Sequence, residues 1–275
     1  MKLELIDVHK SFKDKEVLRG IDLVLPEGKT TVVIGPSGGG KSTILRLLLR
    51  LIVPERGRIL VDGQDLLAFD QKQLNAYRLK VGMVFQMAAL FDSLTIGENV
   101  AFSLLENSDL SHEEMLKIAV EKLKLVDLPD TEDLYPAELS GGMKKRASFA
   151  RAIARDPKAV LYDEPTTGLD PITSTVIEDL IKSLQQHTKA TSVVVTHQLS
   201  TIFRTADVIA MIYEGRIIGT GTPEEFRDHP NPIINQFIEG RVEVEKKTTA
   251  GPDPADRPAG AVQMDFIQPR PGEGQ

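Results

Sequence analysis

The spacing of apolar and polar residues predicts strands and helices in alternation. Two segments near the N-terminus, Leu3–Leu5 and Ile21–Leu25, alternate apolar with polar positions, which is typical of half-buried antiparallel strands. Further along, short apolar runs predict buried strands at Thr30–Ile34, Val81–Phe85, Ala159–Tyr162, Ser192–Thr196 and Val208–Tyr213. Because helical segments separate these runs, the pattern predicts an α/β fold in which helices cover a parallel sheet.

Capping residues mark the starts of several predicted helices. Thr95–Glu98 and Ser111–Glu114 fit the capping box, in which a hydroxyl and a carboxylate satisfy free backbone N–H groups reciprocally. Asp170 supplies a capping carboxylate, and Pro171 suits the first helical position. Thr222–Glu225 combines both devices. These signals place helices between and after the predicted strands.

The series of strands is interrupted after Val81–Phe85. Residues from about 87 to 157 are predicted to be mainly helical, so we expect a helical subdomain inserted into a core that spans residues 1–240. From residue 241 Pro and Gly make up 9 of the last 35 residues, which predicts a largely disordered tail, 241–275. Its short apolar segment (the apolar island), Ala261–Ile267, is either an ordinary part of the disordered tail or a segment that docks on another subunit.

Composition excludes several kinds of site and partner. The chain has no cysteine, which excludes disulfides, thiolate metal sites and a cysteine nucleophile. Its net charge of −7 argues against nucleic acid as a partner, because such a partner requires a basic face. Acidic residues near the start argue against a signal peptide, and no run of about 18 apolar residues predicts a membrane span. Any role at a membrane is therefore expected to depend on a partner.

A phosphate-binding loop is the strongest chemical signal in the sequence. Residues 35–42 match the pattern G-x-x-x-x-G-K-[ST] in full, after a predicted strand and before a helix predicted from Lys41 to about Leu51. Glycines let backbone N–H groups turn toward phosphate, and the helix adds its positive dipole end. Lys41 suits the β- and γ-phosphates of ATP, and the Ser42 hydroxyl suits Mg²⁺. The predicted ATP-binding residues here are Gly35, Pro36, Ser37, Gly38, Gly39, Gly40, Lys41, Ser42 and Thr43.

Polar residues follow other predicted strands at the edge where the phosphates would lie. Asp163 is expected to hold the Mg²⁺ shell, and the adjacent Glu164 to act as general base or orient the attacking water. Gln86 can reach the metal and the water, and His197 can donate a hydrogen bond to the γ-phosphate. These positions converge because ligands in open α/β sheets bind beyond the carboxyl ends of strands. The predicted metal ligands are Ser42, Gln86 and Asp163, and the predicted catalytic residues are Lys41, Glu164 and His197.

With these features, the segment Leu139–Met143 makes the chain resemble the ATP-binding cassette (ABC) ATPases. The resemblance covers about residues 1–240, with the motifs in the family's own order. It implies a P-loop NTPase (RecA-like) core with an antiparallel β subdomain and an inserted helical subdomain. It also implies that residues 139–143 are the signature motif, that residues 167–170 are the D-loop, and that Phe12 stacks on adenine.

The signature segment has the character of a second phosphate clamp, because Ser140 and the N–H groups of Gly141 and Gly142 form a helix N-terminus. The resemblance implies that these residues, together with Asp170 of the D-loop, contact ATP bound by the opposite subunit. One cassette then makes only half of each site. We therefore expect a homodimer with two ATPs between its subunits, closed by ATP and reopened by hydrolysis.

A departure from the family pattern narrows the resemblance. Most members have glutamine after the signature glycines, whereas this chain has Met143. There and at residues 86–95 it resembles the ATPase subunit of Mla-type lipid transporters. That likeness implies a permease and an MCE-type lipid-binding subunit as partners, and a peripheral position on the cytoplasmic face of the inner (cell) membrane. Met87, Leu90 and Phe91 would then either form a docking surface for the permease or join the core of the helical subdomain.

Three functions stay open on the sequence alone. The chain energises a phospholipid transporter, or it serves an importer of amino acids or another small solute, or it is a non-transport cassette protein. The third class, which acts in DNA repair, translation or cluster assembly, usually carries coiled-coil insertions, zinc-binding cysteines or tandem cassettes, and none of these is found here. The transported molecule and its direction do not follow from the sequence, since the permease and its partners determine both.

Overall fold

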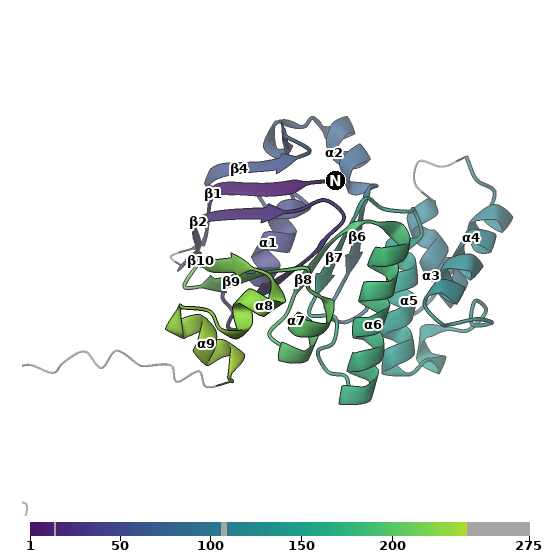
Figure 1. The fold of residues 1–275 in the computed structure, drawn as a ribbon. Coiled ribbons are helices and arrows are strands. Elements are labelled where there is room, and N and C mark those ends of the chain that lie inside the picture. Colours follow the sequence, from purple (N-terminus) through teal and green to yellow (C-terminus); the bar gives the residue numbers. More distant parts are fainter. Residues whose placement is uncertain (14, 106–108, 241–275) are drawn as a thin grey trace, which may run out of the picture. The chain divides into compact units, whose positions relative to one another are not determined.

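The computed structural model describes residues 1–13, 15–105 and 109–240 (Figure 1). The predicted tail and its apolar island therefore lie outside the described residues. Within these ranges, two sheets and the helices packed on them make an α/β fold, and the predicted fold class is confirmed. None of the described helices is long and apolar enough to cross a membrane.

An antiparallel sheet with the strand order β2-β1-β4-β5 contains the N-terminal segments. The predicted alternation is confirmed: Leu3 and Leu5 are buried, and Leu3 pairs with Leu25 on one side and with Val61 on the other. Its last two strands were not predicted from the sequence. The strands are β1 (Leu3–Phe12), β2 (Lys15–Leu25), β4 (Arg56–Val61) and β5 (Gln64–Asp65).

The second sheet has the order β10-β9-β3-β8-β7-β6, and its strands from β9 to β6 pair in parallel. All five predicted buried strands occur in it, with ends shifted by at most one residue. β10 (Arg216–Gly221), which was not predicted, pairs antiparallel with β9. The parallel strands are β3 (Thr30–Ile34), β6 (Val81–Val84), β7 (Ala159–Asp163), β8 (Thr191–Val195) and β9 (Val208–Tyr213).

Alternating side chains of these parallel strands enter two separate hydrophobic cores. Val33 and Leu161 join the core shared with the antiparallel sheet, α1 (Lys41–Leu48) and α2 (Gln71–Arg78). Val32 and Val160, on the opposite face, join the core shared with the other helices. These helices include α3 (Ile96–Ala101), α4 (His112–Leu125), α5 (Gly141–Ile153), α6 (Pro171–Thr188), α7 (Leu199–Thr205), α8 (Pro223–Arg227) and α9 (Pro232–Ile238) (Figure 1). Because the parallel strands are buried on both faces of their sheet, their sequences are continuous apolar runs.

The predicted helix caps are present. Thr95, Ser111 and Thr222 each make the full capping box, and Asp170 caps α6 with Pro171 at its first turn. The predicted end of α1 near Leu51 is wrong, because Arg50 adopts a left-handed backbone (φ 48°) and the chain turns after Leu48. The helix that begins at the signature segment, α5, ends at Ile153.

Candidate functional site

The loop between β3 and α1 has a shape that two of its glycines make possible. Gly35 has a φ of 147°, and a Cβ there would lie 2.2 Å from the carbonyl oxygen of Ile212. Gly40 has a φ of 101°, and a Cβ there would lie 2.7 Å from Cδ2 of Leu18. Any larger residue at these positions would strain the backbone and collide with Ile212 or Leu18. The glycines therefore let the loop approach Ile212 of β9 and Leu18 of β2 closely before α1 begins.

Lys41 begins α1 and points back into this loop. Its side chain is only 6% exposed, and its Nζ donates hydrogen bonds to the carbonyl oxygens of Gly35 (2.9 Å) and Pro36 (3.1 Å). Burial lowers the pKa of Lys41, and the negative charges of Glu164 and Asp163 oppose that effect. Gly40 offers no side-chain cap to the first turn of α1. Backbone N–H groups and a buried cation thus face one place, which suits an anion.

Ser42 and Asp163 bring together oxygen atoms from two elements. The Ser42 Oγ donates a hydrogen bond of 2.7 Å to Oδ1 of Asp163, which ends β7. A hydroxyl and a carboxylate are hard oxygen ligands of the kind that Mg²⁺ takes when phosphates and water complete its shell. The described residues hold no cluster of three or more His, Cys, Asp or Glu able to bind a metal ion by themselves. The donor set therefore fits a magnesium ion that arrives with phosphates rather than a protein-only metal centre.

Glu164 lies at the centre of the polar groups. Its Oε1 is 3.0 Å from Nδ1 of His197 and 3.8 Å from Nζ of Lys41, and its Oε2 accepts a hydrogen bond of 3.1 Å from the Thr167 hydroxyl. The backbone N–H of Glu164 donates to the carbonyl oxygen of Val195 at 2.9 Å, which ties the end of β7 to the end of β8. Glu164 also has a φ of 46°, a conformation that non-glycine residues adopt where the surroundings hold them.

A single cavity of about 380 Å³ gathers most of the predicted ATP-site residues. Phe12, Gln86 and His197 come to it from the ends of three strands. Gly35, Pro36, Gly39 and Asp163 do not line it, although Asp163 is joined to it through Ser42. Val17 does line it and was missed, because the sequence pattern placed the start of its strand only at Ile21. The full lining is Phe12, Val17, Ser37, Gly38, Gly40, Lys41, Ser42, Thr43, Gln86, Glu164 and His197.

The signature residues line a separate cavity, also of about 380 Å³. Ser140 caps α5 and accepts a hydrogen bond from the Met143 N–H at 3.3 Å. Gly141, Gly142 and Asp170 line the same cavity, and no residue is common to the linings of the two cavities. The residues predicted to act in trans are thus gathered with one another, apart from the loop 35–42 of their own chain.

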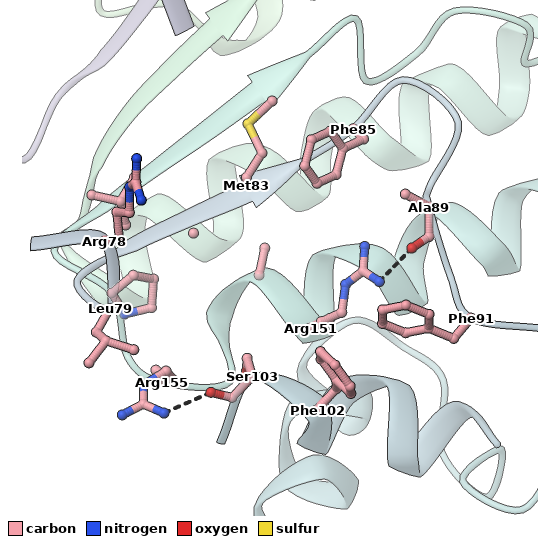
Figure 2. A pocket seen from close by; sticks show the side chains of 14 residues that line it. Arg78, Leu79, Met83, Phe85, Ala89, Phe91, Phe102, Ser103, Arg151 and Arg155 are labelled. Atoms are coloured by element: carbon pink, nitrogen blue, oxygen red, sulfur yellow. Dashed lines mark hydrogen bonds between the residues drawn. The ribbon is translucent and has the colours of Figure 1, made fainter. Parts of the chain in front are cut away.

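An apolar cavity of about 590 Å³ lies between β6, α5 and the turn after α3 (Figure 2). Phe91 and Phe102 meet in it with ring centroids 4.6 Å apart, and Arg151 reaches over to the carbonyl of Ala89. Three residues were predicted either to dock the permease or to join the core. Met87 is 85% exposed and Phe91 is half-exposed in this groove, whereas Leu90 packs partly buried against the core. Leu90 therefore contributes to the core, whereas a docking role for the exposed Met87 and Phe91 stays a prediction.

Comparisons with known proteins agree with this geometry. A sequence profile of the family described as "ABC transporter" matches residues 18–167. The intermembrane phospholipid transport system ATP-binding protein MlaF of Escherichia coli is 35% identical over 265 residues, covering 96% of each chain. Protein TRIGALACTOSYLDIACYLGLYCEROL 3, chloroplastic, of Arabidopsis thaliana is 42% identical over 258 residues, covering 88% of this chain and 74% of that protein.

A relative named for methionine import and a solved cassette structure are also similar to this chain. The methionine import ATP-binding protein MetN 2 of Pseudomonas entomophila is 39% identical over 249 residues, covering 89% of this chain and 74% of that protein. The dimeric post-hydrolysis structure of the ATP-binding cassette MJ0796, bound to ADP and Pi, superposes with a TM-score of 0.73 at 33% identity. It covers 80% of this chain and 98% of that one.

Proposed function

The chain belongs to the ABC transporter family and is an ATP-binding, ATP-hydrolysing transporter subunit, and we propose that it works as a head-to-tail homodimer that drives a membrane permease for phospholipid. The observation that carries the proposal is the separation of two complementary half-sites on one chain. The loop 35–42 and its acids form one half, and the start of α5 with Asp170 forms the other.

In the first half, each side chain has a proposed task. Lys41 and the free N–H groups of α1 hold the β- and γ-phosphates, and Phe12, which lines the same cavity, stacks on the adenine. Ser42, Gln86 and Asp163 are the residues that would hold Mg²⁺, which supplies positive charge to the phosphate oxygens when bound. The remaining chemistry comes from the groups of the chain itself.

Glu164 and His197 provide the proposed catalytic step. Glu164 orients the attacking water and takes up its proton, because its carboxylate faces the cavity from the end of β7. His197 holds that carboxylate through its Nδ1 and donates from its other ring nitrogen to the γ-phosphate. The bond to the Thr167 hydroxyl fixes the second carboxylate oxygen, so that Glu164 keeps one orientation.

The proposed dimer completes each site with residues from the other subunit. Ser140, Gly141 and Gly142 present a helix N-terminus of α5 to the γ-phosphate bound by the partner, with Asp170 beside them. The dimeric MJ0796 cassette, whose structure this chain resembles along most of its length, supports this arrangement. ATP would favour the closed dimer and hydrolysis the open one.

Mixing two inactive variants tests the composite site. Lys41→Ala disables the phosphate loop and Ser140→Arg blocks the signature segment, so each homodimer has two defective sites. In a mixed dimer both defects fall on one site, and the other site is intact. We expect ATPase activity to reappear when the two purified variants are combined. Continued inactivity of a verified mixed dimer would contradict the head-to-tail arrangement.

Phospholipid is the proposed cargo because MlaF, a phospholipid transport protein by name, matches this chain over nearly its whole length. The likeness to MetN 2 favours a small-solute importer as the second candidate. We propose a permease and an MCE-type lipid-binding subunit as partners, and the cytoplasmic face of the inner membrane as the location. Affinity purification of the chain from membranes tests this choice. A permease with an MCE-type protein supports lipid transport, a solute-binding protein supports the second candidate, and recovery without any membrane protein supports a non-transport role.

The apolar cavity beside α5 is the proposed docking place for the permease. Phe85, Phe91 and Phe102 line it, and the exposed Met87 lies in the same loop. Exposed apolar side chains around a groove are typical of a protein interface. We further propose that residues 87–157 act as a helical subdomain that carries this surface, within a nucleotide-binding domain of residues 1–240.

A further inference from the structure

Lys145 is a buried cation on the signature helix that the proposed mechanism does not use. It is 4% exposed and lies on α5, which Ser140 caps. Its Nζ donates hydrogen bonds to the carbonyl oxygens of Phe85 (3.2 Å) and Gln86 (2.5 Å). The side chain therefore joins the helix that begins at the signature segment to the backbone of the proposed metal-side glutamine.

Lys145 is held by the dipoles of two backbone carbonyl groups rather than by an ion pair. Within the described residues no carboxylate lies at ion-pair distance from its Nζ, and Asp163 attracts it only through space. A buried charge without a counterion is costly, and an apolar side chain of the same length would fill the space without that cost. The two carbonyl bonds are the interactions that such an apolar replacement would lose.

A second cation of α5 holds the far end of the same turn. Arg151 donates from Nη1 to the Ala89 carbonyl (2.6 Å, Figure 2) and from Nη2 to the Ala88 carbonyl (2.8 Å). Ala88 and Ala89 have φ values of 59° and 53°, which non-glycine residues keep only where neighbouring groups impose them. The turn 85–89 is thus attached to α5 at both ends, with Gln86 nearest to Lys145.

We propose that Lys145 is a positioning residue for ATP hydrolysis, which places Gln86 by holding its carbonyl and so couples the signature helix to the nucleotide cavity. A displacement of α5, when Ser140 meets the partner's nucleotide, would pass through Lys145 to the loop that carries Gln86. This inference rests on the proposed role of Gln86. The proposal adds Lys145 to the residues needed for hydrolysis, which so far were those of the phosphate loop, the acidic residues Asp163 and Glu164, and the signature segment.

Three variants of the full chain test the proposal. Lys145→Met keeps the approximate length of the side chain but removes its positive charge and its N–H donors. Lys145→Arg keeps the positive charge and the N–H donors. Lys124→Met removes one exposed lysine from α4 as a matched control. Two properties are measured: hydrogen exchange of the peptide covering residues 85–91 in nucleotide-free protein, and single-turnover hydrolysis of Mg-ATP with the protein in excess.

We expect Lys145→Met to raise the exchange rate at residues 85–91 and to lower the hydrolysis rate, each by about tenfold, the size typical of losing charge-assisted hydrogen bonds. ATP affinity should change by less than about threefold, since Lys145 does not line the ATP cavity. Lys145→Arg should restore both rates, and Lys124→Met should behave as the unchanged chain. If Lys145→Met does not fold, Lys145→Gln is measured in the same way.

Two results would overturn the proposal. The first is an unchanged exchange rate at residues 85–91 in a folded, uncharged variant. The second is a loss of hydrolysis that Lys145→Arg does not restore, because it would reflect general damage to α5. Gln86→Ala separates this proposal from the one it rests on. Normal hydrolysis by Gln86→Ala would refute the role of Gln86, while the exchange measurement would still show whether Lys145 holds the turn.

Discussion

The Oε1 of Glu164 lies 3.0 Å from Nδ1 of His197, so the ends of two neighbouring strands, β7 and β8, meet through their side chains. The same oxygen is 3.8 Å from Nζ of Lys41, at the start of α1. Three segments that are distant in sequence thereby place a carboxylate, an imidazole and an ammonium group around one point.

Glu164→Gln is expected to lower ATP turnover by about a hundredfold or more, because an amide cannot take the proton of the attacking water. ATP binding should persist, since the phosphate loop is unchanged, and the closed dimer should accumulate. Phosphate release and size-exclusion chromatography with Mg-ATP measure both effects. Glu121→Gln, an exposed position on α4, is the matched control. Near-normal turnover of Glu164→Gln would remove Glu164 from the catalytic role.

Lys41→Ala is expected to weaken ATP binding by about ten- to hundredfold, because the phosphates lose a charge-assisted hydrogen bond. The loop itself should keep its fold, since Gly35 and Gly40 determine its backbone. Titration with a fluorescent ATP analogue measures the affinity, and Lys124→Ala serves as the control for charge. Unchanged affinity together with unchanged turnover would show that the phosphates bind elsewhere.

His197→Ala is expected to lower turnover by about ten- to hundredfold, since the γ-phosphate loses a donor and Glu164 loses the group that orients it. The affinity for ATP should change much less, because Lys41 and α1 remain. Turnover and affinity are measured on the same preparation, with His187→Ala on the exposed face of α6 as control. An affinity loss with normal turnover at saturation would place His197 in binding alone.

Met87→Glu is expected to abolish recovery of the permease while leaving stability and ATP binding nearly unchanged. The side chain is 85% exposed, so a charge there costs the folded chain little, about 0.5 kcal/mol or less. Co-purification from membranes measures recovery, and thermal unfolding measures stability. Val24→Glu, which charges an exposed apolar residue on the antiparallel sheet, is the control. Equal recovery of the permease with both variants would place its docking surface elsewhere.

Local sequence signals predicted much of the site because they express local physics. The phosphate loop needs glycine at Gly35 and Gly40, where any Cβ would collide, and the caps at Thr95 and Ser111 satisfy neighbouring N–H groups. Such requirements involve residues a few positions apart, so a pattern can show them. The strands of the parallel sheet were equally visible, because burial on both faces makes each a short apolar run.

The tertiary structure decided which distant groups bond directly to one another. The sequence predicted Ser42 and Asp163 as ligands of one metal ion. The structure shows that these residues, 121 positions apart, also share a hydrogen bond, because β3 and β7 both lie beside β8 in one sheet. In the sequence Lys145 is one of three consecutive basic residues after Met143, and nothing local distinguishes it, yet packing directs it inward to the carbonyls of Phe85 and Gln86. By itself the sequence determined the chemistry available at each strand end. The fold decided which of those groups share a cavity, because their convergence depends on strand order and helix packing, which no local pattern encodes.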